Sequence, residues 1–595
     1  MAELRNCVIR IPAKDTYSTT GPSLMGRQSA NEGFLKSWFQ YSGHTEFWCM
    51  ARYRSEAQIF ASTAESVHVK SESFSPVYRW IAQNAVHRIA SIGTLYLPGP
   101  QVADVSWLRR RDPIAKSTDF SIVGMTHTSC ELQVQDALAD MLTAPVYEWD
   151  AQICPSPSVQ KMVKRLLDDE AAWLAQHLGA KKITQPQLPI LPLGVDFNSF
   201  NPSHDIKKTH RDHWRAHWKL SKKDVCVLYM GRLDLRTKAN LYPMLDALEI
   251  AASELKRQGK ANIVLVIAGW FASDWDETVI KSAIQNDCSN LRVIIEDGRK
   301  PDVRQGVWHA ADVFTSLVDN IQETFGLTPI EAMASGLPVV VSDYDGYRDS
   351  VRHGVDGYRI PTIQPAAGEG VDLIDAHADV MTSYRDYVSQ ASAMIGIDMA
   401  EAVQAYIRLA SDPVLRTNMG KQGQERAKND YDWARLIPQY INLFDELAII
   451  RHSASQNMTL EEWSASKSAT SDSSHLASRH PRRSDPFYSF EHYPTATLHG
   501  EMTLLPGPLM LSNKNQRLTA LTQQLERPVY QNVKPFLQFE FLADVLDKVA
   551  EEPSGITMQR WIVTQYDAAK KDHWLRQVGW LIKIGFLVTN NHLKL

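Results

Sequence analysis

Cysteine is scarce in this sequence. Its 595 residues include six cysteines, and none of them stands in a C-x-x-C pair. Zinc sites and disulfide-rich domains depend on closely spaced cysteines. We therefore expect neither a zinc site nor a disulfide framework, and scattered cysteines fit a reducing cytoplasm.

Long apolar runs and a strong charge imbalance are also missing. No stretch of about 18 apolar residues occurs, and the first residues lack a charged start followed by an apolar segment. We therefore expect no transmembrane segment, no secretory signal and a cytoplasmic location. The net charge of −5 gives no general attraction to nucleic acid or anionic membranes. With 44% hydrophobic and 22% charged residues, a chain of this length should form several globular domains.

The segment 311–346 has the pattern of a β-α-β unit. Apolar strands are predicted at Ala311 to Val318 and at Pro338 to Ser342, with a short helix at Leu327 to Ser335 between them. Gly326 precedes the helix. Free backbone N–H groups and the positive end of the helix dipole favour a phosphate at such a point.

Two glutamates, Glu323 and Glu331, flank this expected phosphate site. Glutamates are usually solvated, and a bare E-x7-E spacing arises by chance in long proteins. Here the wording E-T-F-G-L-T-P-I-E-A-M-A-S-G-L-P-V-V closely resembles retaining GT-B glycosyltransferases, especially glycosyltransferase family 4. The resemblance implies that Glu323 holds donor-sugar hydroxyls and Glu331 the nucleotide ribose. It also places the donor phosphates at Gly326, Leu327 and Thr328.

The first 200 residues alternate predicted strands with helices, which favours a parallel, doubly wound sheet. The predicted strands are Asn6 to Ala13, Glu46 to Tyr53, Arg88 to Leu97, Phe120 to Thr126, Gln152 to Cys154 and Leu188 to Pro192.

A glycine-containing loop at 17–26 follows the first predicted strand and precedes a helix at about 29–41. Its glycines approach P-loop spacing, but Arg27 and Gln28 replace the Lys and Ser/Thr that a P-loop requires, which argues against an NTPase. The family resemblance makes Gly26 and Arg27 candidates for contacts in the interdomain cleft. A tight turn with a solvated arginine explains the same residues equally well.

His127 directly follows the predicted strand 120–126, at the edge where open α/β sheets bind ligands. Thr128 and Glu131 have the spacing of a capping box for the next helix. The resemblance implies that His127 contacts the donor sugar or the acceptor hydroxyl. A lone histidine is otherwise more often a structural hydrogen-bonding residue.

The segment 190–202 resembles the family's connection between two Rossmann-like domains. A predicted strand at 225–229 is then followed by M-G-R-L-D-L-R-T-K, which resembles the family's diphosphate loop, although Ala239 replaces its final glycine. The resemblance implies that Arg232 and Lys238 bind the donor diphosphate, a task that suits a guanidinium and an ammonium. The alternative is two solvated basic residues.

Two D-x-D spacings, at Asp274 and Asp276 and at Asp343 and Asp345, match a pattern that binds metal in another class of glycosyltransferase. We assign the first pair to the cap of a helix running to Ile284 and the second to a turn. We therefore expect no metal and no other cofactor.

The resemblance does not explain segments 363–397 and 453–595. The first is an apparent insertion, and residues 453–494 are predicted to be a flexible linker. Residues 495–595 should form a small, mostly α module. Its predicted elements are helices at Phe541 to Ala550, Thr557 to Tyr566 and Ala569 to Ile584, and a strand at Gly585 to Thr589. This order resembles a winged helix. We favour a protein-docking or dimerisation role and leave nucleic-acid binding open, because acidic residues dilute the basic ones.

Together these features predict an α/β protein of GT-B architecture. Domain 1–200, completed by a crossing helix at about 433–450, is expected to face a nucleotide-sugar domain at 201–432 across a cleft. The resemblance implies a retaining, metal-independent glycosyltransferase that uses a UDP- or GDP-sugar and an unknown hydroxyl acceptor. The alternatives are a phosphorylase or epimerase of the same fold, and a nucleic-acid-associated protein recruited by its C-terminal module.

Overall fold

The chain divides into two compact units, residues 1–472 and 473–595. The computed structural model describes residues 6–12, 16–17, 26–67, 76–457, 480, 482–483, 485–557, 559, 561 and 573–590. The first unit contains two six-stranded parallel sheets, which confirms the prediction of two Rossmann-like folds. Within the described residues, no helix combines the length and apolarity needed to cross a membrane.

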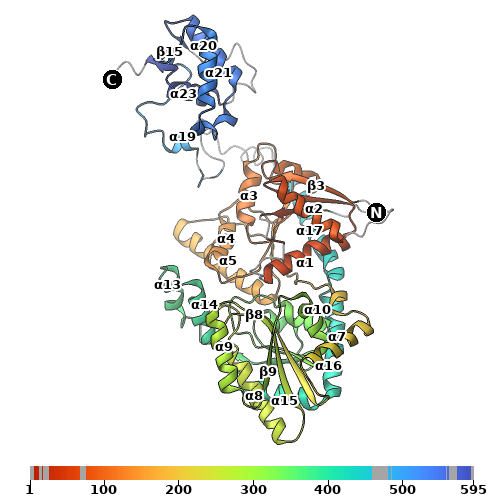
Figure 1. The fold of residues 1–595 in the computed structure, drawn as a ribbon. Coiled ribbons are helices and arrows are strands. Elements are labelled where there is room, and N and C mark those ends of the chain that lie inside the picture. Colours follow the sequence, from red (N-terminus) through yellow and green to blue (C-terminus); the bar gives the residue numbers. More distant parts are fainter. Residues whose placement is uncertain are drawn as a thin grey trace. The chain divides into compact units, whose positions relative to one another are not determined.

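The first sheet has the strand order β3-β2-β1-β4-β5-β6. Its strands are β1 (Val8–Ile11), β2 (Glu46–Ala51), β3 (Val77–Ala82), β4 (Thr94–Tyr96), β5 (Ser121–Met125) and β6 (Ala151–Ile153). The helices that accompany it are α1 (Gly26–Tyr41), α2 (Arg54–Val67), α3 (Val102–Arg111), α4 (Leu132–Ala139) and α5 (Pro157–Leu178) (Figure 1).

Three predictions in this half need correction. The strand expected at Arg88 to Leu97 begins instead as a 3₁₀ helix, Val86–Ser91, and only its end forms β4. The strand expected at Leu188 to Pro192 forms isolated bridges, because its two prolines lack the N–H groups that a ladder requires. Edge strand β3, with the sequence VYRWIA, was missed although it is largely apolar, and half of its six side chains are exposed.

The second sheet has the order β12-β11-β10-β7-β8-β9. Successive strands are therefore added on one side of β7 up to β9 and on its other side from β10 onward, so the strand order reverses between β7 and β10. Its strands are β7 (Asp224–Leu233), β8 (Asn262–Phe271), β9 (Arg292–Asp297), β10 (Val313–Ser316), β11 (Val339–Ser342) and β12 (Gly357–Ile360). Open α/β sheets bind ligands at the carboxyl ends of their strands at such a reversal. The predicted phosphate loops both leave the sheet here.

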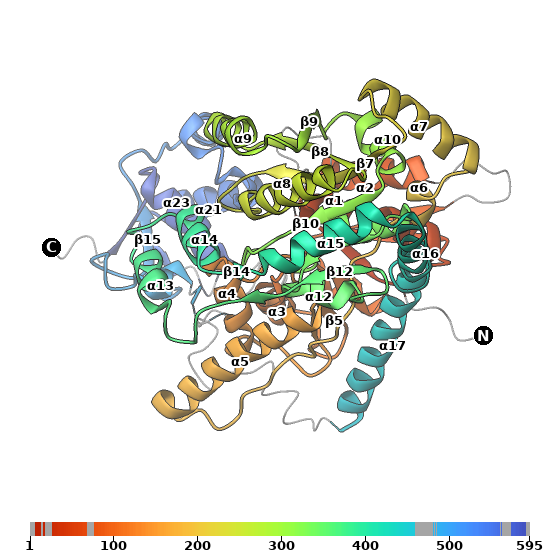
Figure 2. The same cartoon turned by 90° about the horizontal axis from the view of Figure 1, so that it is seen from below.

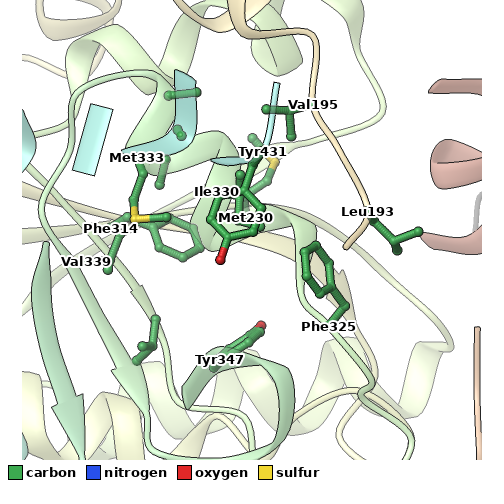
Figure 3. Packing of buried hydrophobic residues seen from close by; sticks show 14 of the residues in the cluster. Leu193, Val195, Met230, Phe314, Phe325, Ile330, Met333, Val339, Tyr347 and Tyr431 are labelled. Carbon is green, nitrogen blue, oxygen red and sulfur yellow. The ribbon is translucent and has the colours of Figure 1, made fainter. Parts of the chain in front are cut away.

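Helices around the second sheet are α6 (Phe197–Phe200), α7 (His204–His217), α8 (Tyr242–Arg257), α9 (Asp274–Asp287), α10 (Pro301–Ala310), α11 (Leu327–Ala334), α12 (Asp345–Ser350), α15 (Met399–Ser411) and α16 (Pro413–Asp430). Helices α8 and α15 lie side by side (Figure 2). Where α11 packs on the sheet, Ile330 and Met333 of the helix and Phe314 of β10 are fully buried (Figure 3). Buried parallel strands of this kind appear in a sequence as continuous apolar runs, which is why 311–346 was informative.

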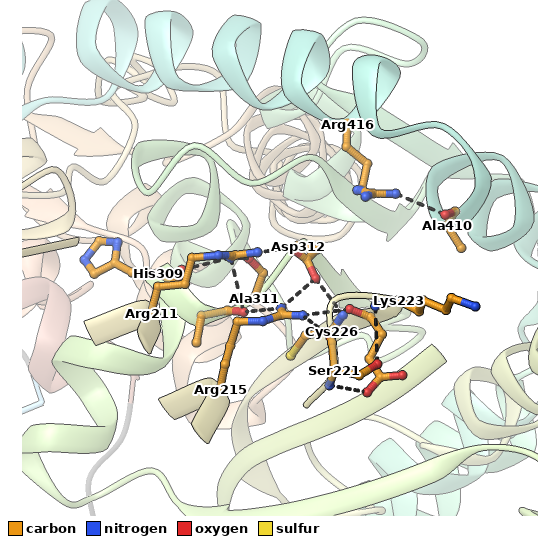
Figure 4. Close-up of polar contacts among 12 residues, drawn as sticks. Arg211, Arg215, Ser221, Lys223, Cys226, His309, Ala311, Asp312, Ala410 and Arg416 are labelled. Atoms are coloured by element: carbon orange, nitrogen blue, oxygen red, sulfur yellow. Dashed lines mark hydrogen bonds and ion pairs between the residues drawn. The ribbon is translucent and has the colours of Figure 1, made fainter. Parts of the chain in front are cut away.

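A partly buried charge cluster fixes α7 to this sheet (Figure 4). Asp312, just before β10, accepts hydrogen bonds from Arg211 at 2.7 Å, from Arg215 at 3.0 Å and from the backbone N–H of Cys226 at 2.8 Å. Both arginines also donate to carbonyl groups at the end of α10. These carbonyls would otherwise lack partners, so the cluster completes a helix terminus as well as an ion pair.

Helix α17 (Trp433–Asn457) returns to the first sheet. The backbone of Val195 pairs with that of Tyr431 and Trp433 where the chain crosses between the sheets. Near the other end, Arg451 donates to the carbonyl of Gly93 at 2.7 Å and to Ser121 Oγ at 2.6 Å. This buried anchor keeps the helix intact beyond 453, so the predicted start of the linker was wrong. Residues 458–479 lie outside the described part of the chain.

The predicted insertion forms two helices between a pair of short antiparallel strands. Its two-stranded base is β13 (Thr362–Ile363) with β14 (Gly396–Ile397), and its helices are α13 (Val371–Ala378) and α14 (Tyr384–Ala393).

The C-terminal unit has a three-stranded antiparallel sheet in the order β16-β15-β17. Its elements are α19 (Pro486–Ser489), β15 (Thr503–Pro506), α20 (Lys514–Leu525), α21 (Phe539–Glu551), β16 (Ile556–Thr557), α23 (Trp574–Lys583) and β17 (Leu587–Thr589). Helices α21 and α23 and strand β17 overlap predicted elements, whereas Thr557, expected in a helix, belongs to a strand. Residues 562–572, which include most of the other expected helix residues here, lie outside the described residues. The winged-helix resemblance stays a prediction.

Candidate active site

Lys238 and Glu323 form an ion pair at the reversal point of the second sheet. Lys238 follows β7, Glu323 precedes α11, and Nζ lies 2.5 Å from Oε2. Their side chains are 28% and 12% exposed. Burial alone would raise the pKa of Glu323 and lower that of Lys238. The charge of each partner and the hydrogen bond between them outweigh burial, so the Glu323 pKa is lowered, the Lys238 pKa is raised, and both are charged at neutral pH.

Arg232 is the next-to-last residue of β7, which is longer than predicted, and it lies just before the loop that carries Lys238. Strand β7 continues to Leu233 because it pairs with β8 along its whole length. The Arg232 guanidinium donates to Thr237 Oγ1 at 3.1 Å and lies 3.4 Å from buried Asp234. Asp234 also accepts the Thr237 backbone N–H at 3.0 Å. Burial would raise the pKa of Asp234, but the Thr237 hydrogen bonds and nearby arginines lower it.

Asp234 organises this loop, a role that was not predicted from the sequence. The signal was present, because an aspartate that bonds backbone groups two and three residues later is typical of a turn.

Helix α14 of the insertion contacts this loop. Arg385 Nη2 donates to Asp234 Oδ1 at 3.1 Å, and Arg236 Nη1 donates to Asp386 Oδ1 at 3.4 Å. Tyr384 donates its hydroxyl to Gln322 Oε1 at 2.9 Å, one residue before Glu323. The insertion therefore supports both loops of the site. No local sequence pattern indicated these contacts, which join residues far apart in the chain.

Two glycines allow the start of α11 and the start of α12 to pack closely against each other. Gly326 has φ = 81°, and a Cβ atom there would clash with the ring of Tyr347. In return, a Cβ atom at Gly346 would clash with the backbone of Phe325. The loop before α11 and the start of α12 are therefore fixed against each other. Leu327 opens α11, so its N–H group and that of the next residue, Thr328, lack intrahelical acceptors.

Glu331 occupies the second turn of α11 and is half-buried. Burial raises its pKa to about 7, against the opposing charges of Arg304 and Lys238. Its carboxylate has no hydrogen bond to another described residue and is available for a ligand hydroxyl.

His127 follows β5, as predicted, and reaches the same loops. Its Nε2 lies 2.9 Å from Asn31 Oδ1, and its backbone carbonyl accepts a hydrogen bond from Thr324 Oγ1 at 2.9 Å. Burial, with a smaller contribution from Arg27, lowers the pKa of His127 to about 4. The imidazole is therefore neutral at physiological pH.

Two further predictions concern the start of α1 and the start of α4. Gly26 and Arg27 are exposed at the start of α1, and a Cβ atom at Gly26 would contact nothing within 4 Å, so no close approach requires glycine there. The capping box at Thr128 and Glu131 is wrong, because α4 begins after Glu131 without a side-chain cap.

The first D-x-D pair also differs from its prediction. Ser273, not an aspartate, caps α9, which continues past Ile284 to Asp287. Asp276 is buried and accepts hydrogen bonds from the Leu235 backbone at 3.0 Å and from Ser273 Oγ at 2.5 Å.

A cavity of about 820 Å³ lies beside Glu323. One wall is formed by Ser129 and the first turns of α5, and the other by the segment 343–349 and both ends of the insertion. The two Rossmann-like folds therefore share a ligand-sized space.

Part of this chain is similar in sequence to known glycosyltransferases. Residues 210–374 match the family Glycosyl transferases group 1. D-inositol 3-phosphate glycosyltransferase of Pseudarthrobacter chlorophenolicus is 27% identical over 277 residues, which cover 45% of this chain and 51% of that protein. The enzyme of the same name from Nocardia farcinica is 31% identical over 193 residues, covering 32% and 39%. Phosphatidyl-myo-inositol mannosyltransferase of Mycobacterium leprae is 23% identical over 378 residues, covering 63% and 77%.

The chain spans about half the length of the first curated relatives it matches. Among solved structures, Anabaena Alr3699/HepE in complex with UDP is similar at 12% identity and a TM-score of 0.45, with 74% of this chain and all of that chain covered. The family match is confined to residues 210–374, and the two Rossmann-like sheets give the fold a GT-B architecture.

Proposed function

We propose that this protein is a retaining glycosyltransferase that moves a sugar from a nucleotide-sugar donor to a hydroxyl acceptor. The ion pair between Lys238 and Glu323 is the observation that carries the proposal. It sets a cation and a carboxylate beside the start of α11, where the sheet reverses. A diphosphate and a sugar hydroxyl are the groups that such a pair suits.

In the proposed reaction, the bond between the anomeric carbon and the donor diphosphate breaks. A new bond forms to the acceptor oxygen on the same face, and the acceptor proton passes to a leaving phosphate oxygen. Arg232, Lys238 and the N–H groups at Gly326, Leu327 and Thr328 stabilise the charge that develops on the diphosphate. Glu323 orients the donor sugar.

Other site residues have supporting roles in the proposal. Glu331 binds the ribose, and neutral His127 hydrogen-bonds a sugar or acceptor hydroxyl. Gly26 and Arg27 lie at the first-domain side of the cleft. Two cationic side chains supply the positive charge, so we propose that no metal is required.

We propose a UDP- or GDP-sugar as donor. Relatives named for inositol 3-phosphate and phosphatidyl-myo-inositol support a polyol hydroxyl as the acceptor class. All six cysteines, each within the described residues, are unpaired, in keeping with a reducing cytoplasm. For the C-terminal unit we propose docking to a protein or to a second copy, because Phe487, Val529 and Phe536 are exposed there.

The test is nucleotide release from a panel of UDP-, GDP- and ADP-sugars in the presence of EDTA. We expect slow release from one donor, lost in Glu323→Gln. Glu277→Gln is the matched control, because Glu277 pairs with Lys281 at the same 2.5 Å on the exposed surface of α9. A requirement for inorganic phosphate would indicate a phosphorylase. If no nucleotide were released in EDTA and added magnesium restored the release, metal independence would be contradicted. No release and no donor-induced thermal shift would overturn the proposal.

A further inference from the structure

Asp345 is an unusual residue in the wall of the cavity. Its φ is 45°, in the left-handed region that favours glycine. Among the described residues, three other non-glycine residues share a positive φ, but only Asp345 lines this cavity. Aspartate tolerates this conformation better than most residues, yet at a cost relative to glycine.

The Asp345 carboxyl accepts a hydrogen bond from the backbone N–H of Gly346, but the fold gives its Oδ2 atom no partner. Helix α12 begins at this residue, but its N-cap is Tyr344 and no side chain caps the helix. The Oδ2 atom of Asp345 is shielded from solvent and has no hydrogen-bond partner among the described residues. A shielded, unpaired carboxylate oxygen is a second unfavourable feature at the same position.

Neighbouring contacts fix Asp345 beside Glu323. The close fit of Gly346 against the backbone of Phe325 sets the distance between the two loops. From the first domain, Ser158 Oγ donates to the backbone carbonyl of Asp345 at 3.4 Å and to the Asp349 carboxylate at 3.1 Å. Glu323 and Asp345 both line the cavity of about 820 Å³.

The cavity borders the expected diphosphate position at Glu323, but the cationic side chains of that position do not line it. Arg232 and Lys238 are both among the described residues, and neither lines it. Lys238 reaches Glu323 from the loop after β7, whereas Asp345 approaches from the loop after β11. The space beside Asp345 is therefore suited to the group that attacks the sugar rather than to the group that leaves.

We propose that Asp345 is a catalytic residue that hydrogen-bonds the attacking hydroxyl of the acceptor. This inference rests on the proposed function. If the carboxyl turns toward the cavity, a bound hydroxyl supplies the hydrogen-bond partner that Oδ2 lacks, and the need for that contact accounts for an aspartate where glycine fits the backbone better. Burial first, then the negative charges of Glu323 and Asp349, raise the pKa of Asp345 above its ordinary value.

The test separates stability from turnover. Asp345→Gly should melt at or above the wild-type temperature, because glycine relieves the backbone cost. It should bind UDP or GDP within twofold of wild type by calorimetry, yet release nucleotide from the donor about 100-fold more slowly. Water is the acceptor in this hydrolysis assay, so no acceptor needs to be identified. Asp345→Asn, which keeps the size of the side chain, should also lose turnover.

Val380→Gly is the matched control. Val380 has φ = 60° but is 88% exposed in the insertion, so its replacement should stabilise the protein without changing turnover. Wild-type turnover in Asp345→Gly would overturn the inference alone. Loss of UDP or GDP affinity in parallel with turnover would place Asp345 at the donor and overturn its acceptor role. A wild-type protein that turns over no donor would overturn the proposed function as well.

Discussion

Replacing Lys238 by methionine removes one charge of the central ion pair and keeps most of the side-chain volume. At 2.5 Å, the attraction between Lys238 and Glu323 is roughly 7 kcal/mol for an effective dielectric constant of ~20. Desolvation of both groups offsets part of this, so we expect a net loss of about 2–4 kcal/mol in the free energy of unfolding. If Lys238 also stabilises the leaving diphosphate, nucleotide release should fall about 10²–10³-fold.

Two further variants separate these effects. The double variant Lys238→Met with Glu323→Gln leaves no lone charge, so its stability should recover while its turnover stays low. Lys281→Met is the control, since its exposed pair with Glu277 is worth only about 0.3–0.5 kcal/mol. Stability is measured by urea unfolding and turnover by nucleotide release. Turnover within threefold of wild type in Lys238→Met, or recovery of turnover in the double variant, would refute the role of Lys238 at the diphosphate.

The pair also predicts an acid dependence. The pKa of Glu323 in the folded protein lies below its ordinary value of 4.5. The stability that the carboxylate contributes is therefore present above pH 4.5 and is lost as the pH falls through the lowered pKa. Urea midpoints measured across this range should show that this loss is smaller in Lys238→Met than in the wild type.

Three other predictions follow from the same structure. Gly326→Ala should destabilise the protein by more than about 2 kcal/mol, because of both its φ and the clash with a buried tyrosine ring, whereas Gly26→Ala should be nearly neutral; thermal unfolding of the two variants compares them. Arg109→Met should cost about 3–5 kcal/mol in urea unfolding, because it strands the fully buried Asp150 carboxylate, and a cost below 1 kcal/mol would contradict this. The pKa of His127 is lowered from 6.5 to about 4, so protonation favours the unfolded state; stability should rise with pH between these values, and His127→Gln should reduce that slope in a pH series of melting curves.

The sequence was most informative where local pattern and burial coincide. The unit at 311–346 was predicted closely because β10 and β11 are buried on both faces and Gly336 stands just past the C-cap of α11. The family resemblance assigned Lys238 and Glu323 to the same donor site, although it did not predict the ion pair between them.

What the sequence could not indicate depends on contacts between distant segments. The contact of Arg385 with Asp234 joins residues that lie 151 positions apart, and no spacing rule connects them. Strand β15 was missed because it is only four residues long and is preceded and followed by irregular chain. The backbone conformation of Asp345 was likewise invisible, since a turn was predicted there without its sign of φ.

The return of α17 to the first sheet means that the first domain is not encoded by one continuous stretch of sequence. The rings of Trp433 and Tyr440 pack against Phe34, and Phe444 packs against Trp38. A fragment that stops near residue 200 would leave these aromatic surfaces of α1 bare. We expect residues 1–200 to be recovered in folded form only when residues 433–457 are supplied as a separate peptide, so that this helix acts as a detachable complementing segment.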